Sequence, residues 1–185
     1  MKSKSLVKPT TLDYIILGLL QQAPQTGYRI RKAIEETALG NFGGSPGTIY
    51  PALRRLKEFG LVENQAVQGK SKSKFSISEK GIGLLRQWLL EPPSKEQVHK
   101  HMELLILQFA FMDPLLSKEQ KFDFLNHLKQ NLENYIAELE SYFHNAKDTM
   151  PFNGQLAFQH GMLSYKSSLQ WCEIAKQSLD RVKVD

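Results

Sequence analysis

Residues 45–78 read SPGTIYPALRRLKEFGLVENQAVQGKSKSKFSIS. Serine followed by proline favours the start of a helix, because serine caps free backbone N–H groups and proline at the first helical position needs none. Ile49, Leu53 and Leu56 recur at helical spacing as a buried stripe, and Gly60 fits the stop. The apolar period then becomes alternating, which predicts two short strands around a tip at 68–73. A helix followed by a β-hairpin is therefore expected.

Two helices are predicted before this stretch and one after it. Thr10 can cap the first helix, whose apolar positions recur at helical spacing until Pro24 ends it. Thr26 can cap the second helix, and the fourth covers about 78–90. The order of helix, helix, helix, hairpin and helix is that of a winged helix-turn-helix domain.

A pair of prolines, Pro92 and Pro93, marks the predicted end of this module. Two successive prolines end a helix and make a stiff connector. We therefore expect a winged helix-turn-helix domain over 1–91 and an all-α domain over 92–185. The fold class is mainly α, with the second domain resembling a coiled coil and serving dimerisation.

The second domain is predicted to contain three helices. The first, over 102–112, is apolar almost all round and must be covered on most sides. The second, over 118–148, has a narrow stripe with gaps of 3 and 4 residues, which is typical of a coiled coil. That stripe consists of Leu125, Leu128, Leu132, Tyr135, Leu139 and Tyr142. A last helix has nearly the same spacing, so the two long helices are expected to form an antiparallel hairpin.

Positive charge is concentrated in the first domain. Residues 1–91 contain 14 Lys and Arg against 7 Asp and Glu (14 − 7 = +7), whereas residues 92–185 contain 10 against 12 (10 − 12 = −2). Such a basic half is consistent with a polyanion-binding module and equally with a solvated surface. The single Cys172 cannot form an internal disulfide, and no apolar signal or membrane-spanning run occurs. A cytoplasmic protein is expected.

The outward face of the helix beginning at Ser45 is the candidate reader of double-stranded DNA. The N-terminal end of such a helix enters the major groove, where hydroxyls contact phosphates or bases and arginine binds phosphate or guanine. The candidate residues are Ser45, Thr48, Tyr50, Arg54 and Arg55. Capping by the serine, packing of the tyrosine and solvation of the arginines are the alternative roles.

The hairpin tip carries the sharper signal for DNA. Lys70, Lys72 and Lys74 alternate with serines, so in an extended segment their side chains project to one side and can contact successive phosphates. An ordinary loop tip or an edge strand guarded by lysines is the alternative, and the surrounding fold favours phosphate contact. On the second helix, Tyr28, Arg29 and Lys32 are further candidates, although pairing with the following glutamates is an equal alternative for the basic side chains.

Several segments resemble the PadR family of bacterial transcription regulators. They are LDYIILGLL (12–20), TGYRI (26–30), GTIYPALRRL (47–56), GLV (60–62) and KFSISEKG (74–81). The resemblance is strong over 10–90 and loose over 95–183, where it is similar to the longer subgroup with a helical dimerisation domain. It implies DNA contact by the third helix and the wing, and a homodimer on a palindromic operator. Thr26, Arg29 and Phe75 depart from the pattern, which leaves the operator and any effector unassigned.

The dimer is expected to form through the apolar helix and the two long helices. The candidate contacts are Leu105, Phe109, Met112, Phe158, Met162, Leu169 and Trp171. A pocket for a small aromatic effector is a second use of the aromatic side chains, although aromatic residues at helical spacing are more often core or interface. The aromatic residues concerned are Phe109, Phe111, Phe152, Phe158, Tyr165 and Trp171.

The function expected from these features is transcription regulation. Repression is the simplest mechanism, since a bound dimer can exclude polymerase. Activation, or a ligand- or protein-interaction module that has lost DNA binding, is the alternative. No nucleophile–base pair, glycine-rich phosphate loop or metal-type cluster occurs at suitable spacing, so neither an enzyme nor a cofactor or metal is expected.

Overall fold

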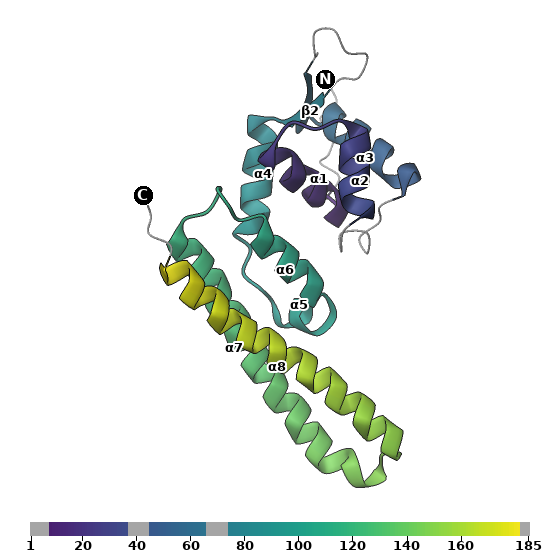
Figure 1. Ribbon diagram of the computed structural model, residues 1–185, viewed down its shortest axis with the longest axis vertical. Coiled ribbons are helices and arrows are strands. Elements are labelled where there is room, and N and C mark those ends of the chain that lie inside the picture. Colours follow the sequence, from purple (N-terminus) through teal and green to yellow (C-terminus); the bar gives the residue numbers. More distant parts are fainter. Residues whose placement is uncertain (1–7, 37–44, 66–73, 182–185) are drawn as a thin grey trace. The chain divides into compact units, whose positions relative to one another are not determined.

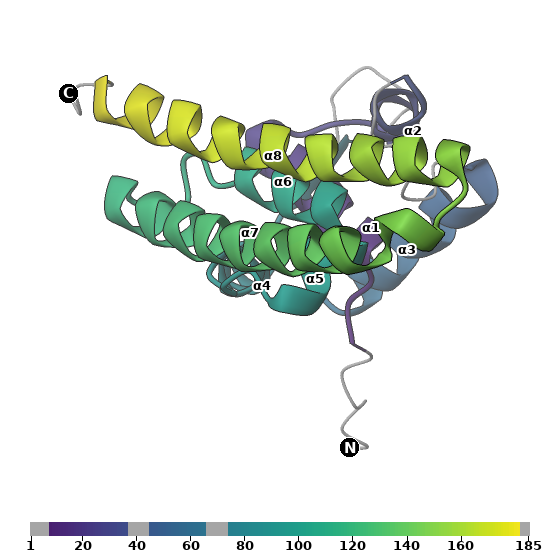
Figure 2. The same cartoon turned by 90° about the horizontal axis from the view of Figure 1, so that it is seen from below.

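The structure, a computed structural model, describes residues 8–36, 45–65 and 74–181. Helices predominate in these ranges, with a two-stranded antiparallel sheet (Figures 1 and 2). The chain divides into an N-terminal unit, Met1–Trp88, and a C-terminal unit, Leu89–Asp185. The boundary lies three residues before the position that the proline pair indicated.

The N-terminal unit contains its elements in the predicted order. They are α1 (Thr11–Gln22), α2 (Gly27–Glu35), α3 (Pro46–Glu58), β1 (Val62–Gln65), β2 (Lys74–Ile77) and α4 (Glu79–Leu89). The strands pair with Val62 opposite Ile77 and Gln65 opposite Lys74. The hairpin tip, with Lys70 and Lys72, lies outside the described residues.

Short polar signals begin and end these helices as the sequence indicates. The Thr10 side chain accepts a hydrogen bond from the Asp13 N–H, and the Asp13 side chain accepts one from the Thr10 N–H, which completes a capping box at α1. The Thr26 hydroxyl caps α2 by accepting from the Arg29 N–H. Gly60 follows α3 with φ of +67°, a left-handed conformation that glycine adopts without steric cost.

One apolar core holds the N-terminal unit together. The predicted stripe of α3, Ile49, Leu53 and Leu56, is buried, and so are apolar side chains from α1, α2 and α4. The largest of these are Ile15, Ile16, Leu17, Leu20, Ile30, Ile34 and Leu85. Burial of apolar surface, at roughly 25 cal/mol per Å², is the main term that stabilises such a core.

The C-terminal unit is entirely helical in its described part. Its elements are α5 (Lys95–Lys100), α6 (Met102–Ala110), α7 (Lys118–Ala146), the 3₁₀ turn η2 (Lys147–Thr149) and α8 (Phe152–Arg181). The proline pair is followed by the short helix α5, which the sequence analysis missed. Ser94 and Gln97 form a capping box at its start, so the S-x-x-Q pattern was the available signal.

The long helices α7 and α8 run antiparallel and side by side, as predicted (Figures 1 and 2). Ion pairs join them along their length: Lys118 to Asp180 at 3.1 Å, Lys129 to Glu173 at 2.5 Å and Lys166 to Glu140 at 2.6 Å. The first of these pairs connects the start of α7 to the end of α8, and the other two follow in the antiparallel order.

The buried stripe of α7 departs from the predicted one towards its C-terminal end. Leu125, Leu128 and Leu132 are buried as expected, but the next buried side chain is Ile136, and Tyr142 is 57% exposed. A strict spacing of 3.5 residues drifts by about 20° per heptad around a helix of 3.6 residues per turn. The buried positions therefore follow the 3.6-residue period, so Tyr142 is not buried as predicted, although its ring stacks on Phe158 of α8 at 5.7 Å.

The side chains expected to form the dimer contact pack within their own unit. Leu105 and Met112 are buried in the core of a single chain. The Phe109 ring packs edge-on against Trp171 at 5.3 Å, and Phe158, Met162 and Leu169 are half-buried. Leu105 and Met112 therefore cannot contact a second chain without opening this core.

Cys172 is the one fully buried side chain in the described helix α8. Burial raises its pKa to about 11 from an ordinary value of 9.0. Because the thiolate is the reactive form, we expect the native protein at pH 8 to react with Ellman's reagent at least 100-fold more slowly than the urea-unfolded chain. Equal rates in the two states would contradict the burial of this thiol.

No helix of the described part is long and apolar enough to cross a membrane.

Candidate nucleic-acid interface

One face of α3 is turned away from the core and carries polar and aromatic side chains. Tyr50 and Arg54 are exposed and lie one helical turn apart, whereas Ile49 and Leu53 beside them are buried. The helix continues through Pro51, which is exposed on the same side. This face presents a planar phenol and a guanidinium, two groups that can contact base edges and phosphates.

The N-terminal end of α3 presents two exposed hydroxyls. The Ser45 side chain forms no capping hydrogen bond to the helix; its Oγ lies 3.3 Å from the Thr48 Oγ1 instead. The Thr48 hydroxyl donates to the Ser45 carbonyl at 2.8 Å. A helix N-terminus with backbone N–H groups and hydroxyls attracts anions, so this end suits a phosphate oxygen or a base acceptor.

A tight junction joins α2, α3 and β2. A Cβ atom at Gly27 would lie 3.0 Å from Tyr50 Cε1 and 3.6 Å from Phe75 Cε2, so glycine permits the close approach of the three elements. Beside it, the backbones of Gln25 and Phe75 exchange two hydrogen bonds of 3.0 and 2.7 Å. The base of the wing, including exposed Lys74, is thereby fixed against the start of α2.

Two basic side chains of α2 pair with carboxylates four residues further along the chain. Arg31 pairs with Glu35 at 3.2 Å and Lys32 with Glu36 at 3.6 Å. Such exposed pairs contribute only about 0–1 kcal/mol, so a phosphate can displace them. Arg29 and Lys32 border an open hollow of about 360 Å³ on the surface of this helix. Tyr28 is exposed, with the Arg31 guanidinium 5.3 Å from its ring centre.

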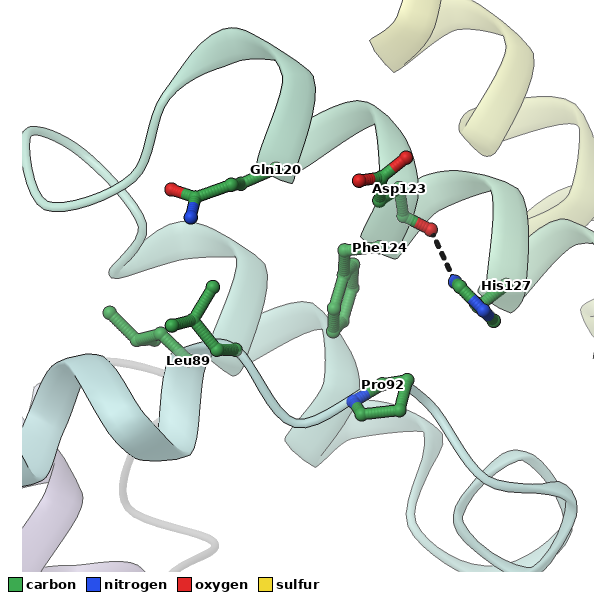
Figure 3. Close-up of a pocket in the computed structure, with 7 residues that line it drawn as sticks. Leu89, Pro92, Gln120, Asp123, Phe124 and His127 are labelled. Carbon is green, nitrogen blue, oxygen red and sulfur yellow. Dashed lines mark hydrogen bonds between the residues drawn. The ribbon is translucent and has the colours of Figure 1, made fainter.

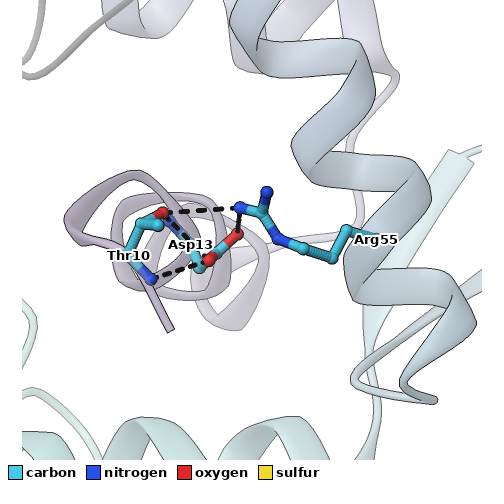
Figure 4. Close-up of polar contacts among 3 residues, drawn as sticks. All are labelled: Thr10, Asp13 and Arg55. Carbon is cyan, nitrogen blue, oxygen red and sulfur yellow. Dashed lines mark hydrogen bonds and ion pairs between the residues drawn. The ribbon is translucent and has the colours of Figure 1, made fainter. Parts of the chain in front are cut away.

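Arg55 does not share the surroundings of Arg54. Its Nη2 donates to the Asp13 carboxylate at 2.6 Å and lies 3.4 Å from the Thr10 hydroxyl oxygen, at the start of α1 (Figure 4). The Asp13 side chain is 3% exposed and that of Arg55 36%. The two adjacent arginines, which the sequence analysis grouped together, therefore lie in different environments.

Sequence reasoning missed Asp13, Gln25 and Gly27 as residues that support this face. The capping role of Asp13 was visible in the T-x-x-D pattern, but its partner Arg55 lies 42 residues away and no local pattern connects them. The pairing of Gln25 with Phe75 likewise joins distant segments. Such contacts depend on the tertiary fold.

The C-terminal unit has a small hollow beside α7, of about 250 Å³. Leu89, Pro92 and Phe124 give it an apolar wall, while Gln120, Asp123 and His127 line its polar side (Figure 3). His127 Nδ1 lies 2.7 Å from the Asp123 carbonyl. Ligand pockets of drug-like size measure about 300–1,000 Å³, so this hollow is below that range.

The aromatic cluster proposed as an effector pocket is instead filled by its own rings. Phe158 stacks on Phe143 at 5.2 Å, and Tyr165 packs edge-on against Tyr135 at 4.9 Å. Phe152 differs from these packed rings, because 72% of it is exposed. Within residues 8–36, 45–65 and 74–181, no three His, Cys, Asp or Glu side chains are grouped to hold a metal ion.

Together, three helices, a wing and a polar face on the third helix define a winged helix-turn-helix domain. Residues 16–87 match the family model described as "Transcriptional regulator PadR-like family". The Escherichia coli (strain K12) protein "Transcriptional regulator YqjI" is 38% identical over 87 residues, which cover 47% of this chain and 39% of that protein. The segment 16–87 is therefore similar to the PadR-like family, whose members are transcriptional regulators and not enzymes.

The match to YqjI leaves most of that longer relative uncovered, since the chain spans 39% of its length. Among solved structures, Bacillus subtilis PadR in complex with operator DNA has a TM-score of 0.41 and 23% identity, with 91% of this chain and 98% of that chain covered. The same protein in complex with p-coumaric acid has a TM-score of 0.42 and 21% identity, with 92% and 99% covered.

Proposed function

We propose that this chain is a DNA-binding transcription regulator that acts as a homodimer on a palindromic operator and represses transcription. The observation that carries this proposal is the junction of Gly27, Tyr50 and Phe75, which fixes the polar face of α3 and the base of the wing in one unit. The match of residues 16–87 to the PadR-like family model supports the same conclusion.

In this proposal, α3 enters the major groove with its N-terminal end. Ser45 and Thr48 contact the backbone or base edges there, Tyr50 and Arg54 contact bases or phosphates along the groove, and Lys74 with Lys70 and Lys72 binds flanking phosphates. Tyr28, Arg29 and Lys32 of α2 contact the backbone beside them. Phosphate contacts give most of the affinity and base contacts give the sequence preference.

The homodimer contact is assigned to the outer face of α8. Phe152, Leu156, Leu163 and Ile174 are between 48% and 72% exposed. Their separations of 4, 7 and 11 residues return each of them to one face of a helix with 3.6 residues per turn. An apolar stripe on a helix whose opposite face already packs on α7 suits burial against the same stripe of a second copy. This face replaces Leu105 and Met112 as the proposed contact.

Two such units on a palindrome would place their α3 helices in successive major grooves, about 34 Å apart.

Measuring the affinity of the protein for DNA distinguishes the proposed function from its alternatives. The full-length protein would be used to enrich duplexes from a random-sequence library, and affinity would then be measured between about 50 and 200 mM salt. A dimer making six phosphate contacts loses about 1,000-fold in affinity over this range. Absence of binding at low salt would favour an interaction module without DNA function, and increased transcription from the operator would indicate an activator.

Replacing Lys70, Lys72 and Lys74 together with alanine is expected to weaken binding to every duplex. Each lost phosphate contact lowers the slope of log affinity against log salt by about 0.9, so three contacts lower it by about 2.7 per protomer. The matched control replaces Lys95, Lys100 and Lys166, three exposed lysines of the C-terminal unit, and removes the same net charge. A changed sequence preference with an unchanged slope would contradict the assignment of the wing to phosphates.

A further inference from the structure

The side chains of the adjacent residues Arg54 and Arg55 differ in their exposure and in their contacts. Arg54 is exposed on the outer face of α3. The Arg55 guanidinium is bound across to α1, with Nη2 2.6 Å from Asp13 Oδ1 (Figure 4). The carboxylate it binds is almost completely buried, whereas the pair at Arg31 and Glu35 on the surface of α2 is solvated on both sides.

Both oxygens of Asp13 are in use. Oδ2 accepts from the Thr10 N–H at 2.8 Å and from the Thr10 hydroxyl at 2.9 Å, while Oδ1 accepts from Arg55. A buried carboxylate needs such partners because it has lost the solvation of water. If Arg55 turned towards a DNA phosphate, it would leave this carboxylate without its counter-charge, so the pair disfavours a direct contact.

The ion pair also adds a directional contact between α1 and α3, which apolar packing does not provide. The apolar contacts that pack α1 against α3 are non-directional and allow small rotations of a helix. A short charge-assisted hydrogen bond is directional and fixes the rotation of α3 against α1. Thr48 lies seven residues before Arg55, roughly 10 Å along the helix, so a small change of angle at the pair displaces the end proposed to enter the groove.

We infer that Arg55 is a positioning residue, which acts through Asp13 to set the angle of α3, and that Arg54 is the arginine that contacts DNA. This inference rests on the proposed DNA-binding function. It assigns the pair of Arg55 and Asp13 a role in sequence preference, whereas Arg54 contributes to affinity for any duplex.

The test compares Arg54→Met, Arg55→Met and Asp13→Asn in the full-length protein. Each is titrated with a duplex enriched by the wild-type protein and with a shuffled duplex of the same length and composition. Asp13→Asn keeps a side-chain oxygen for the Thr10 cap and removes the charge that holds Arg55. Arg54→Met is expected to weaken binding to both duplexes and to reduce the slope of log affinity against log salt by about 0.9 per protomer.

Arg55→Met and Asp13→Asn are each expected to weaken binding to the enriched duplex about 10-fold. The affinity for the shuffled duplex and the slope of log affinity against log salt should stay unchanged. The double variant should be no weaker than the single ones, because both changes break one interaction. Arg55→Lys, which keeps the charge opposite Asp13, should recover part of the lost preference and remains measurable if Arg55→Met does not fold. A purely structural role would leave the ratio of the two affinities unchanged in folded variants.

Two outcomes would overturn the inference while leaving the proposed function intact. A reduced salt slope in Arg55→Met, equal to that in Arg54→Met, would show direct phosphate contact by Arg55. An unchanged preference in folded Arg55→Met and Asp13→Asn would show that the pair does not position the helix. If the wild-type protein binds neither duplex at low salt, the proposed function itself fails.

Discussion

Replacing Gly81 with alanine is expected to destabilise the N-terminal unit by about 3 kcal/mol, a large part of the stability of a typical small domain. A Cβ atom at this position would lie 2.2 Å from the Leu61 carbonyl oxygen and 2.8 Å from Ile77 Cγ1. The Leu61 carbonyl cannot move freely, because it accepts a hydrogen bond from the Ser78 N–H at 3.1 Å. The added methyl group must therefore separate α4 from the hairpin.

Gly83→Ala provides the matched control for this prediction. Gly83 lies on the same helix, is exposed, and would have nothing within 4 Å of an added Cβ. Alanine there should stabilise the unit by about 0.5–1 kcal/mol, because glycine is a poor helix former. Urea unfolding followed by Trp88 fluorescence, in a Trp171→Phe background, measures both changes. Equal effects of the two substitutions would contradict the packing described for α4.

Replacing Leu163 with glutamate is expected to separate the proposed dimer and to weaken operator binding about 100-fold. Leu163 is 66% exposed in the single chain, so the substitution leaves the fold of the C-terminal unit intact. In a dimer the same position would bury a charge against an apolar stripe, which strongly disfavours association. A monomer has only one DNA-binding domain, so it loses the gain in affinity from bivalent binding, which is typically a factor of about 100 or more.

Ser164→Glu is the control for this second prediction. Ser164 is exposed and lies beside Leu163, but about a quarter of a turn off the apolar stripe. Light scattering should show a monomer for Leu163→Glu and a dimer for both the wild-type protein and Ser164→Glu. A dimer that persists in Leu163→Glu at micromolar concentration would show that another surface joins the two copies.

The sequence predicted the elements whose signals are local. Thr10 and Gly60 lie at the ends of their helices, and the stripe of α3 is buried, because caps and helical periodicity act over a few residues. Local periodicity did not predict the exposure of Tyr142, because spacings of 3.5 and 3.6 residues diverge along a long helix, although its ring still stacks on Phe158 of α8.

The candidate site was predictable only in part for the same reason. The exposed positions of α3 follow from its period, so Tyr50 and Arg54 could be placed on the outer face. The burial of the Arg55 partner depends on where α1 packs, and the crowding at Gly81 depends on the hairpin behind it. Neither contact has a signal within a few residues of its own position.

The double hydrogen bond between Gln25 and Phe75 has a consequence for how such a regulator is switched. Reorienting the wing relative to the second helix would break two backbone hydrogen bonds of 3.0 and 2.7 Å between the half-buried residues Gln25 and Phe75. In the proposed dimer, a signal that releases DNA would therefore act at lower energetic cost by displacing each N-terminal unit as a rigid body. The distance between the two N-terminal units, rather than their internal shape, would then be the quantity that such a signal changes.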